Sequence, residues 1–207
     1  MQVLSESEVA EFRKAAADDR HGIVFDFLLG TGCRPGEALA VRWADLDLAE
    51  GVVRIRRSLA WLKGVPTFKD PKTAGSRRSI PLPGRLVAGL SVHRRAQAAQ
   101  ILEQGAVYDR EADLVFANEI GGPLELRNLT QRHFKEILKR AKLPAAVRLY
   151  DLRHTHATLL LAGGVHPKIA SERLGHASTA MTLDVYSHVV PGMQHEAAQL
   201  IDRTLFW

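Results

Sequence analysis

A tyrosine near the C-terminal end of this chain is preceded by residues that could hold and activate a phosphate group. Tyr186 lies in the segment Thr182–His188, and the segments Asp151–His156 and Leu174–His176 come before it. A lone tyrosine is more often a core aromatic than a nucleophile. A phenol that attacks phosphate needs neighbours that supply positive charge and transfer protons. The arginine and the histidines upstream therefore favour a nucleophilic role for Tyr186.

A second arginine lies at the predicted start of a helix. Pro35 fits the first helical turn, so Arg34 stands at the N-terminus of that helix. Free N–H groups and the helix dipole favour anions there, and a guanidinium adds a forked donor for two phosphate oxygens. Glu37 could orient this guanidinium. The plain alternative is a surface arginine that forms an ion pair along its own helix.

Arg153, His176 and Lys72 carry weaker individual signals. Asp151 can cap the helix that follows, which puts Arg153 in the first turn, where the dipole disfavours a cation and an anionic partner is expected. His176 follows a glycine and could donate to phosphate, or it could simply cap a helix C-terminus. Lys72 lies in the turn 69–76 and could protonate a leaving oxygen.

His154 and His156 raise the question of a zinc site. They are two residues apart, which puts them on different faces of a helix, whereas helical metal pairs usually need a spacing of i, i+4. No cysteine lies nearby. The sequence therefore argues against a metal site, and His154 is predicted to be a packed or hydrogen-bonded helix residue.

The composition is ordinary for a globular domain that buries a core. The chain has 207 residues, 46% of them hydrophobic and 25% charged, and a net charge of +5 that mildly favours a polyanionic partner. The single cysteine, Cys33, excludes a disulfide framework and fits a reducing, cytosolic setting. The first residues lack the pattern of a signal peptide, and no apolar run approaches the ~20 residues of a membrane span.

Periodicity and capping signals predict an α+β chain that is predominantly helical. Ser5 and Glu8 form a capping box for a helix through Asp19. Further predicted helices cover residues 23–29, 35–40, 84–103, 127–141, 152–162, 167–174, 178–189 and 194–204. Predicted strands at 52–58, 61–68 and 78–82 form one small three-stranded antiparallel sheet, and residues 45–51 are predicted as turns.

Five of these segments occur in the order found in one family. The chain resembles the catalytic domain of the tyrosine recombinases, the phage-integrase family, at Thr31–Glu37, Lys72, Asp151–Thr155, Leu174–His176 and Tyr186. The resemblance covers essentially the whole chain, and five pieces in order are a specific signal. It implies the tyrosine-recombinase catalytic fold.

The resemblance also implies DNA strand exchange without a metal or nucleotide cofactor. Tyr186 would attack the scissile phosphate and form a covalent 3′-phosphotyrosyl link, which leaves a free 5′-hydroxyl. Arg34, Arg153 and His176 would stabilise charge on the non-bridging oxygens, and Lys72 would protonate the leaving 5′-oxygen.

One position departs from the family pattern. Histidine usually lies three residues before the second arginine, and Tyr150 occupies that place here. A phenol with an ordinary pKa of about 10 is a poor general base at neutral pH. Tyr150 could still hydrogen-bond a phosphate oxygen, and the proton of Tyr186 would then pass to another group or to water.

Basic residues elsewhere are candidates for DNA contacts. The region 127–142 is predicted to be a basic helix, either a solvated charged face or a helix that enters a DNA groove. The individual candidates are Arg77, Arg78, Arg127, Asn128, Arg132 and Arg148. The tail 196–207 is predicted to form an interface, since in the family such a tail often docks on a neighbouring protomer of a tetramer on DNA.

Residues 1–207 are expected to form one catalytic domain. Recombinases of the family usually carry an N-terminal core-binding domain, which this sequence does not contain, so the chain is either a piece of a longer protein or a naturally short one. The resemblance implies a cytoplasmic, nucleoid-associated prokaryotic protein. Two other functions stay open: a non-catalytic DNA-binding relative, motivated by Tyr150, and a topoisomerase-like enzyme that nicks and closes DNA.

Overall fold

The computed structural model describes residues 2–70, 77–176, 178–186 and 193–206, and it confirms a mostly helical α+β fold. The helices are α1 (Glu6–Ala16), α2 (Gly22–Thr31), α3 (Pro35–Ala38), α4 (Gly84–Gln104), α5 (Leu126–Asn128), α6 (Lys135–Arg140), α7 (Asp151–Ala162), α8 (Pro167–Leu174), α9 (Thr179–Tyr186) and α10 (Met193–Leu205). The strands are β1 (Leu46–Asp47), β2 (Val52–Ile55), β3 (Ser58–Leu62), β4 (Val65–Lys69) and β5 (Arg78–Pro81). Short 3₁₀ turns cover Trp43–Asp45 and Gly105–Val107.

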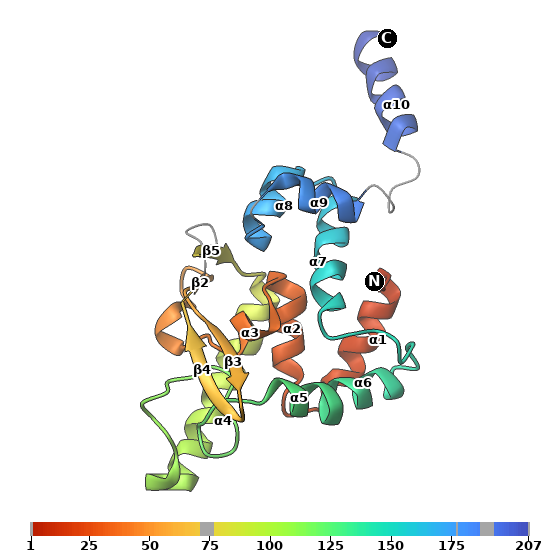
Figure 1. Ribbon diagram of the computed structural model, residues 1–207. Coiled ribbons are helices and arrows are strands. Elements are labelled where there is room, and N and C mark those ends of the chain that lie inside the picture. The colour runs from red at the N-terminus through yellow and green to blue at the C-terminus, as the bar shows by residue number, and fades with distance from the viewer. Residues whose placement is uncertain (1, 71–76, 177, 187–192, 207) are drawn as a thin grey trace.

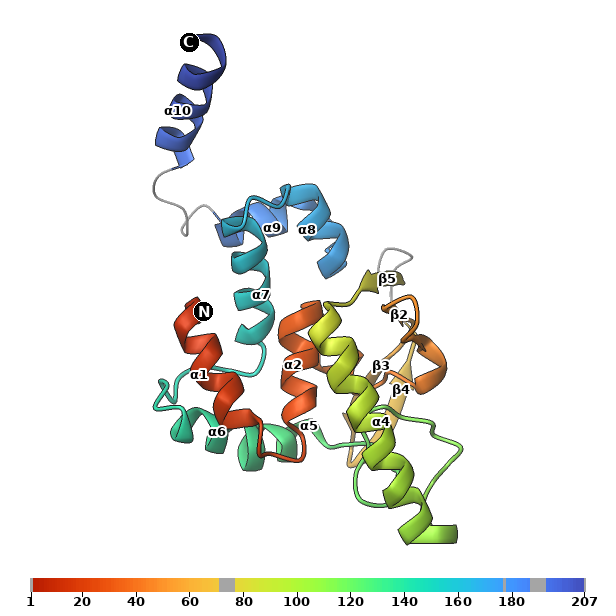
Figure 2. The same cartoon turned by 180° about the vertical axis from the view of Figure 1, so that it is seen from behind.

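Helix α2 lies at the centre of the body, with α7 on one side and α4 on the other (Figures 1 and 2). Its sequence is apolar around nearly the whole helix, as expected for a helix that is buried on most sides. Phe25 of α2 meets Phe12 of α1 and Phe134, with ring centroids 5.9 and 5.7 Å apart. Phe27 packs on Phe116 at 5.2 Å. These aromatic contacts fix the helices around α2.

The prediction that residues 52–58, 61–68 and 78–82 form one sheet is wrong about which strands pair. Strands β1, β2 and β5 form the three-stranded antiparallel sheet, whereas β3 and β4 pair only with each other. The predicted strand 61–68 contains a turn at Lys63 and Gly64, whose φ angles of 51° and 81° fold the chain back on itself. That pair of left-handed residues is typical of a tight hairpin turn. The third strand, β1, comes from the region predicted as turns.

The remaining helices agree with the predicted ranges to within a few residues. The predicted helix 127–141 is continuous across α5, a π-helical segment at Leu129–Phe134, and α6. Residues 187–189 of the predicted helix 178–189 lie outside the described residues. None of the helices in the described ranges combines the length and apolarity that a membrane crossing requires.

Helix α10 lies apart from the body in both views (Figures 1 and 2). The side chains of residues 198–206 are all exposed, among them the large apolar side chains of Leu200, Ile201, Leu205 and Phe206. A helix with this much exposed apolar surface is typical of an interaction segment. Phe206, the aromatic residue of the tail that the structure describes, is 74% exposed and therefore does not pack on its own domain.

The C-terminal end of α2 is fixed by a left-handed glycine. Gly32 has a φ of 64°, and its N–H donates to the carbonyl oxygen of Leu28. A Cβ atom at this position would lie 2.3 Å from Cδ2 of His156 and 2.9 Å from Cδ2 of Leu174. Because α7 and the end of α8 contact this turn so closely, Gly32 sets the position of Arg34 relative to both helices.

Replacement of Gly32 by alanine tests this constraint. We expect Gly32→Ala to lower the free energy of unfolding by more than ~2 kcal/mol, because the left-handed backbone costs about 1 kcal/mol and the collision with His156 adds strain. Gly64→Ala is the matched control, since Gly64 also has a positive φ but has open space around it. That control should lose only about 1 kcal/mol. Urea denaturation measures both, and equal losses would contradict the close approach.

Candidate active site

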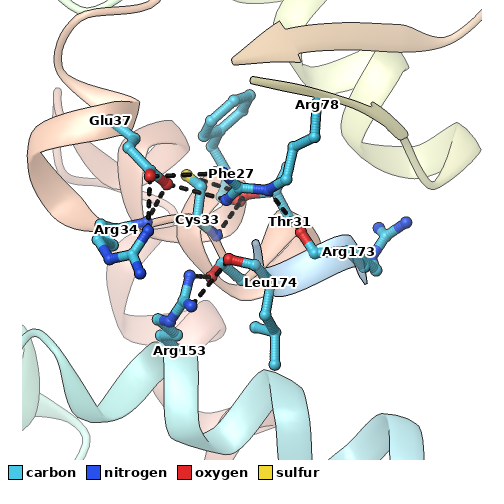
Figure 3. Close-up of polar contacts among 10 residues, drawn as sticks. Phe27, Thr31, Cys33, Arg34, Glu37, Arg78, Arg153, Arg173 and Leu174 are labelled. Carbon is cyan, nitrogen blue, oxygen red and sulfur yellow. Dashed lines mark hydrogen bonds and ion pairs between the residues drawn. The ribbon is translucent and has the colours of Figure 1, made fainter. Parts of the chain in front are cut away.

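Arg34 is held at the start of α3 by Glu37. The carboxylate of Glu37 accepts from the backbone N–H of Arg34 at 2.9 Å and from its Nη1 at 2.9 Å (Figure 3). Pro35 occupies the first turn of α3, as predicted. The Arg34 side chain is 37% exposed, so its guanidinium stays accessible from outside. The predicted role of Glu37 in orienting Arg34 therefore agrees with these contacts.

Arg153 is buried and bridges two backbone turns. Its Nη1 donates to the carbonyl oxygen of Gly32 at 2.7 Å, and its Nη2 donates to that of Leu174 at 2.8 Å (Figure 3). Burial, and secondly the charge of Arg34, lower the pKa of Arg153 to about 10, which leaves it protonated at neutral pH. Within the described residues its hydrogen bonds go to carbonyl groups and not to a carboxylate. A buried cation of this kind is suited to meet an incoming anion.

Asp151 does not cap α7 in the way that the sequence predicted. It is the first residue of the helix, and its carboxylate reaches back to the backbone N–H of Arg148 at 3.0 Å and to the Arg148 guanidinium at 2.9 Å. Tyr150 occupies the N-cap position instead. The physical reason is that residues 148–151 already form a turn, which the buried Asp151 carboxylate closes.

His176 joins the end of α8 to the helix that carries Tyr186. It follows Gly175, whose φ of 67° ends α8, and its Nδ1 lies 2.8 Å from the hydroxyl oxygen of Thr182. Thr182 is buried in α9, one helical turn before Tyr186. Burial, and then the charges of Arg153, Arg34 and Arg78, lower the pKa of His176 to about 4. The ring is therefore neutral at neutral pH.

A cavity of about 120 Å³ connects these groups. Its lining residues are Tyr150, Arg153, His154, Ala157, Leu174, His176 and Thr182. Tyr150 is 40% exposed, and its ring packs against that of His154 with centroids 5.3 Å apart. Burial is the main cause that lowers the pKa of His154. The cavity thus brings together Tyr150, one buried guanidinium and two imidazoles beside α9.

Two predicted catalytic side chains are not placed by the structure. Lys72 lies outside the described residues. The backbone of Tyr186 forms the end of α9, but its side chain also lies outside what is described. The roles assigned to these two residues stay predictions.

Two surface grooves are lined in part by residues of the candidate site, one by Arg34 and Tyr150 and the other by Arg78. One, of about 770 Å³, runs from Arg34 and Tyr150 to Arg127 and Gln131 on the helical region 126–140. The other, of about 930 Å³, is strongly basic. Its lining includes Arg54, Arg56, Arg57, Lys69, Arg77 and Arg78, with Asp70 as its acidic member. Arg54, Arg56, Arg57 and Lys69 are not among the predicted DNA contacts, although Arg54 and Arg56 alternate with Val53 and Ile55 in the sequence.

The predicted DNA contacts fall into three different environments. Arg127, Asn128 and Arg132 are exposed and available to a large partner, and Arg77 is exposed but forms an ion pair with Asp70 at 3.8 Å. Arg148 is also exposed, but it is ion-paired with Asp151. Arg78 differs from all of these, because its side chain is only 7% exposed and pairs with Glu37. Its burial could have been read from the sequence, since Arg78 shares one face of β5 with the buried Ile80.

Both ring nitrogens of His156 form hydrogen bonds that connect helices. Its Nδ1 lies 2.7 Å from the carbonyl oxygen of Leu29, and its Nε2 accepts from Nε of Arg173 at 3.2 Å. Arg173 also donates to the carbonyl oxygen of Gly30 at 2.8 Å. Because both ring nitrogens of His156 are engaged, the zinc interpretation fails at this residue. The pair instead ties α7 and α8 to the end of α2.

Comparison with known proteins assigns this chain to a family. The model of the phage integrase family matches residues 2–192. A tyrosine recombinase XerC-like protein of Caldanaerobacter subterraneus is 33% identical over 98% of this chain and 54% of its own length. The ICEBs1 integrase of Bacillus subtilis is 31% identical over 84% of this chain and 46% of its own length. The chain therefore belongs to the phage integrase family of tyrosine recombinases, and it spans about half the length of these relatives.

Solved structures show the same fold at low sequence identity. The Tn1549 transposon integrase in complex with transposon right end DNA has a TM-score of 0.78 at 23% identity, over 98% of this chain and 66% of that one. The catalytic domain of bacteriophage HP1 integrase has a TM-score of 0.60 at 17% identity, over 98% of this chain and 96% of that one. These likenesses confirm the predicted catalytic-domain fold.

The buried state of His156 predicts that acid destabilises the domain. Burial, and then the charge of Arg173, lower the pKa of His156 to about 4 from an ordinary value of 6.5. Between these values the unfolded chain binds a proton that the folded chain does not. Stability from this residue is therefore complete above pH 6.5 and is lost as the pH falls toward 4.

His156→Gln keeps a donor and an acceptor but does not titrate. We expect the variant to be less stable at pH 7. Between pH 4 and 6.5, the slope of its free energy of unfolding against pH should be smaller than that of the wild type, by about 1 kcal/mol per pH unit. Urea denaturation at several pH values measures both slopes. An unchanged slope in the variant would contradict the assignment.

Proposed function

We propose that this chain is the catalytic domain of a site-specific DNA recombinase that cleaves and rejoins DNA through a covalent 3′-phosphotyrosyl intermediate. The observation that carries the proposal is the convergence of Arg34, Arg153 and His176, of which His176 contacts α9 through Thr182. Two guanidiniums held close together, one of them buried, are unfavourable unless an anion joins them. A phosphate whose charge grows during in-line attack fits that requirement.

The proposed cleavage step assigns a task to each group of the candidate site. The phenol oxygen of Tyr186 forms a bond to phosphorus while the bond from phosphorus to the 5′-oxygen breaks. Arg34 and Arg153 donate to the non-bridging oxygens, and His176 adds a neutral donor. The departing 5′-oxygen takes a proton from Lys72. Rejoining reverses these steps with a new 5′-hydroxyl, so no external energy source is needed.

The proton of the attacking phenol needs an acceptor other than Tyr150. A phenol in the usual place of the family's histidine is a weak base at neutral pH. His154 and His176 line the same cavity, and both are kept neutral by their lowered pKa values. Neutral imidazoles can accept a proton, so these two residues are the better candidates, and Tyr150 acts as a hydrogen-bond donor to phosphate.

The two grooves give a path for double-stranded DNA beside Arg78 and beside Arg34 and Tyr150. The basic groove at the sheet would hold phosphates through Arg54, Arg56 and Lys69, and the other groove presents Arg127 and Gln131 to the duplex. Contacts of this kind position the scissile phosphate, and they specify little sequence. The protein would act in the cytoplasm of a prokaryote, on the nucleoid.

The C-terminal helix would join protomers on DNA. Helix α10 presents Leu200, Ile201 and Leu205 to solvent, and the family resemblance implies that such a tail docks on a neighbouring recombinase in a tetramer. Burial of these side chains on a second copy would remove their apolar surface from water. We therefore propose that the tail 196–207 is the contact between protomers.

A nicked suicide DNA tests the cleavage chemistry. The piece that carries the 5′-hydroxyl diffuses away after cleavage, so the wild-type chain should accumulate a covalent protein–DNA complex on a denaturing gel. Tyr186→Phe lacks the nucleophile and should form none. An adduct with Tyr186→Phe would refute the assignment of the nucleophile. The substrate must contain a recombination site that this protein recognises.

The same experiment separates the alternatives. DNA binding without any adduct, in the wild-type chain, would support a non-catalytic relative. Relaxation of a supercoiled plasmid without strand exchange would support a topoisomerase-like enzyme.

Deletion of residues 203–207 tests the tail. The deletion removes part of the exposed apolar face of α10, so we expect assemblies of several protomers on DNA to be lost, while cleavage of a single suicide site by one protomer is retained. Native gel shifts and light scattering on a full recombination site measure the assembly. Unchanged assembly would count against the tail as an interface.

A further inference from the structure

Arg78 lies where three parts of the candidate active site meet. It begins β5, and its side chain is 7% exposed. Its Nη2 donates to Oε2 of Glu37 at 2.9 Å and its Nη1 to Oε1 at 3.4 Å (Figure 3). Its Nε donates to the carbonyl oxygen of Arg173 at 2.7 Å. One side chain thus connects the sheet, the turn of Arg34 and the end of α8.

The carboxylate of Glu37 is shared between two arginines. Arg34 binds it with its backbone N–H and its Nη1, and Arg78 binds it from the buried side. Burial alone would raise the pKa of Glu37, but the hydrogen bond and charge of Arg78, followed by those of Arg34, lower it. Arg78 therefore neutralises the carboxylate, and the positive charge of Arg34 stays available to an anion in the groove.

Arg78 also packs against the turn that carries His176. A Cβ atom on Gly175 would lie 2.8 Å from Nη1 of Arg78, so the backbone of this turn rests directly on the guanidinium. The carbonyl oxygen of Arg173 accepts from Arg78, and that of Leu174 accepts from Arg153. Two consecutive carbonyls at the end of α8 are thus held by two different arginines, which fixes the direction in which His176 leaves the helix.

We infer that Arg78 is a positioning residue for DNA cleavage: it acts through Glu37 on Arg34 and through the end of α8 on His176. The inference rests on the proposed function. Without Arg78, Arg34 would be the bidentate partner that the Glu37 carboxylate keeps among these contacts. Arg34 would then be drawn toward Glu37, and the net positive charge beside the phosphate would be lower.

Two substitutions separate charge from geometry. Arg78→Met removes the charge, and Arg78→Lys keeps it but cannot form the fork to Glu37 together with the bond to Arg173. In single-turnover cleavage of the suicide substrate, we expect Arg78→Met to be slower by about 10²-fold and Arg78→Lys by about 10-fold, since each weakens preorganised charge stabilisation. The dissociation constant for DNA should change less than threefold in both, because the side chain is buried.

A methylphosphonate at the scissile position gives the decisive comparison. Replacing one non-bridging oxygen by a methyl group makes the phosphate neutral, so a correctly aimed Arg34 matters less. The penalty of Arg78→Met should therefore shrink to less than about 10-fold on this substrate. An equal penalty on both substrates would mean that Arg78 only supports the fold, and would overturn the inference.

The control variant is Arg13→Met. Arg13 of α1 forms an ion pair with Asp26 of α2 at 2.6 Å and not with a residue of the candidate site, so its loss should leave cleavage of both substrates unchanged. If Arg78→Met does not fold, Arg78→Lys on the two substrates decides in its place. Wild-type rates for the Arg78 variants, with an active wild-type chain, would refute the inference alone. An inactive wild-type chain would refute the proposed function, and the inference would fall with it.

Discussion

The main physical constraint on this structure is that several positively charged guanidinium groups lie close together in its interior. Arg78 and Arg153 are nearly excluded from solvent, Arg34 lies beside them, and Arg34 and Arg78 share the carboxylate of Glu37. Buried guanidiniums are tolerated only when their N–H groups are satisfied. Backbone carbonyls accept from Arg153 and from Nε of Arg78, so Arg153 stays charged while its described hydrogen bonds go to carbonyl groups.

Two helix C-termini supply these carbonyls. The end of α2 offers oxygens of Leu29, Gly30 and Gly32, which face His156, Arg173 and Arg153 respectively. The end of α8 offers oxygens of Arg173 and Leu174 to Arg78 and Arg153. Helix C-termini carry partial negative charge and unpaired carbonyl groups, so they suit cations. The convergence of α2 and α8 thus creates the cationic centre, and the left-handed Gly32 and Gly175 make the close approach possible.

The sequence predicted the parts of this arrangement that depend on local chemistry. Pro35 and Glu37 indicated how Arg34 begins its helix, and the glycine after Leu174 indicated where α8 ends; both agree with the structure. The sheet was mispredicted because the left-handed pair Lys63 and Gly64 hides a hairpin within a β-rich run. Asp151 was wrongly predicted as the N-cap of α7, because its carboxylate instead closes the preceding turn at Arg148.

Interactions between segments distant in sequence could not be predicted in this way. Arg78 and Glu37 are 41 residues apart, and Arg153 and Gly32 are 121 apart, so no local pattern records that they meet. A basic residue in a β-rich region was naturally assigned to the surface. The two-residue alternation with Ile80 was the available signal for burial, and it conflicts with the general rule that arginine is exposed.

The cationic centre also decides which groups can accept a proton. Burial and the positive charges of Arg153, Arg34 and Arg78 lower the pKa of His176 and hold it neutral. The same field that would attract a phosphate therefore leaves the imidazole free of a proton but makes it a weak base. When a phosphate enters, its negative charge offsets that field, and the pKa of a nearby imidazole rises toward its ordinary value. A base whose strength increases only when substrate is bound fits a site in which Tyr150 has replaced histidine.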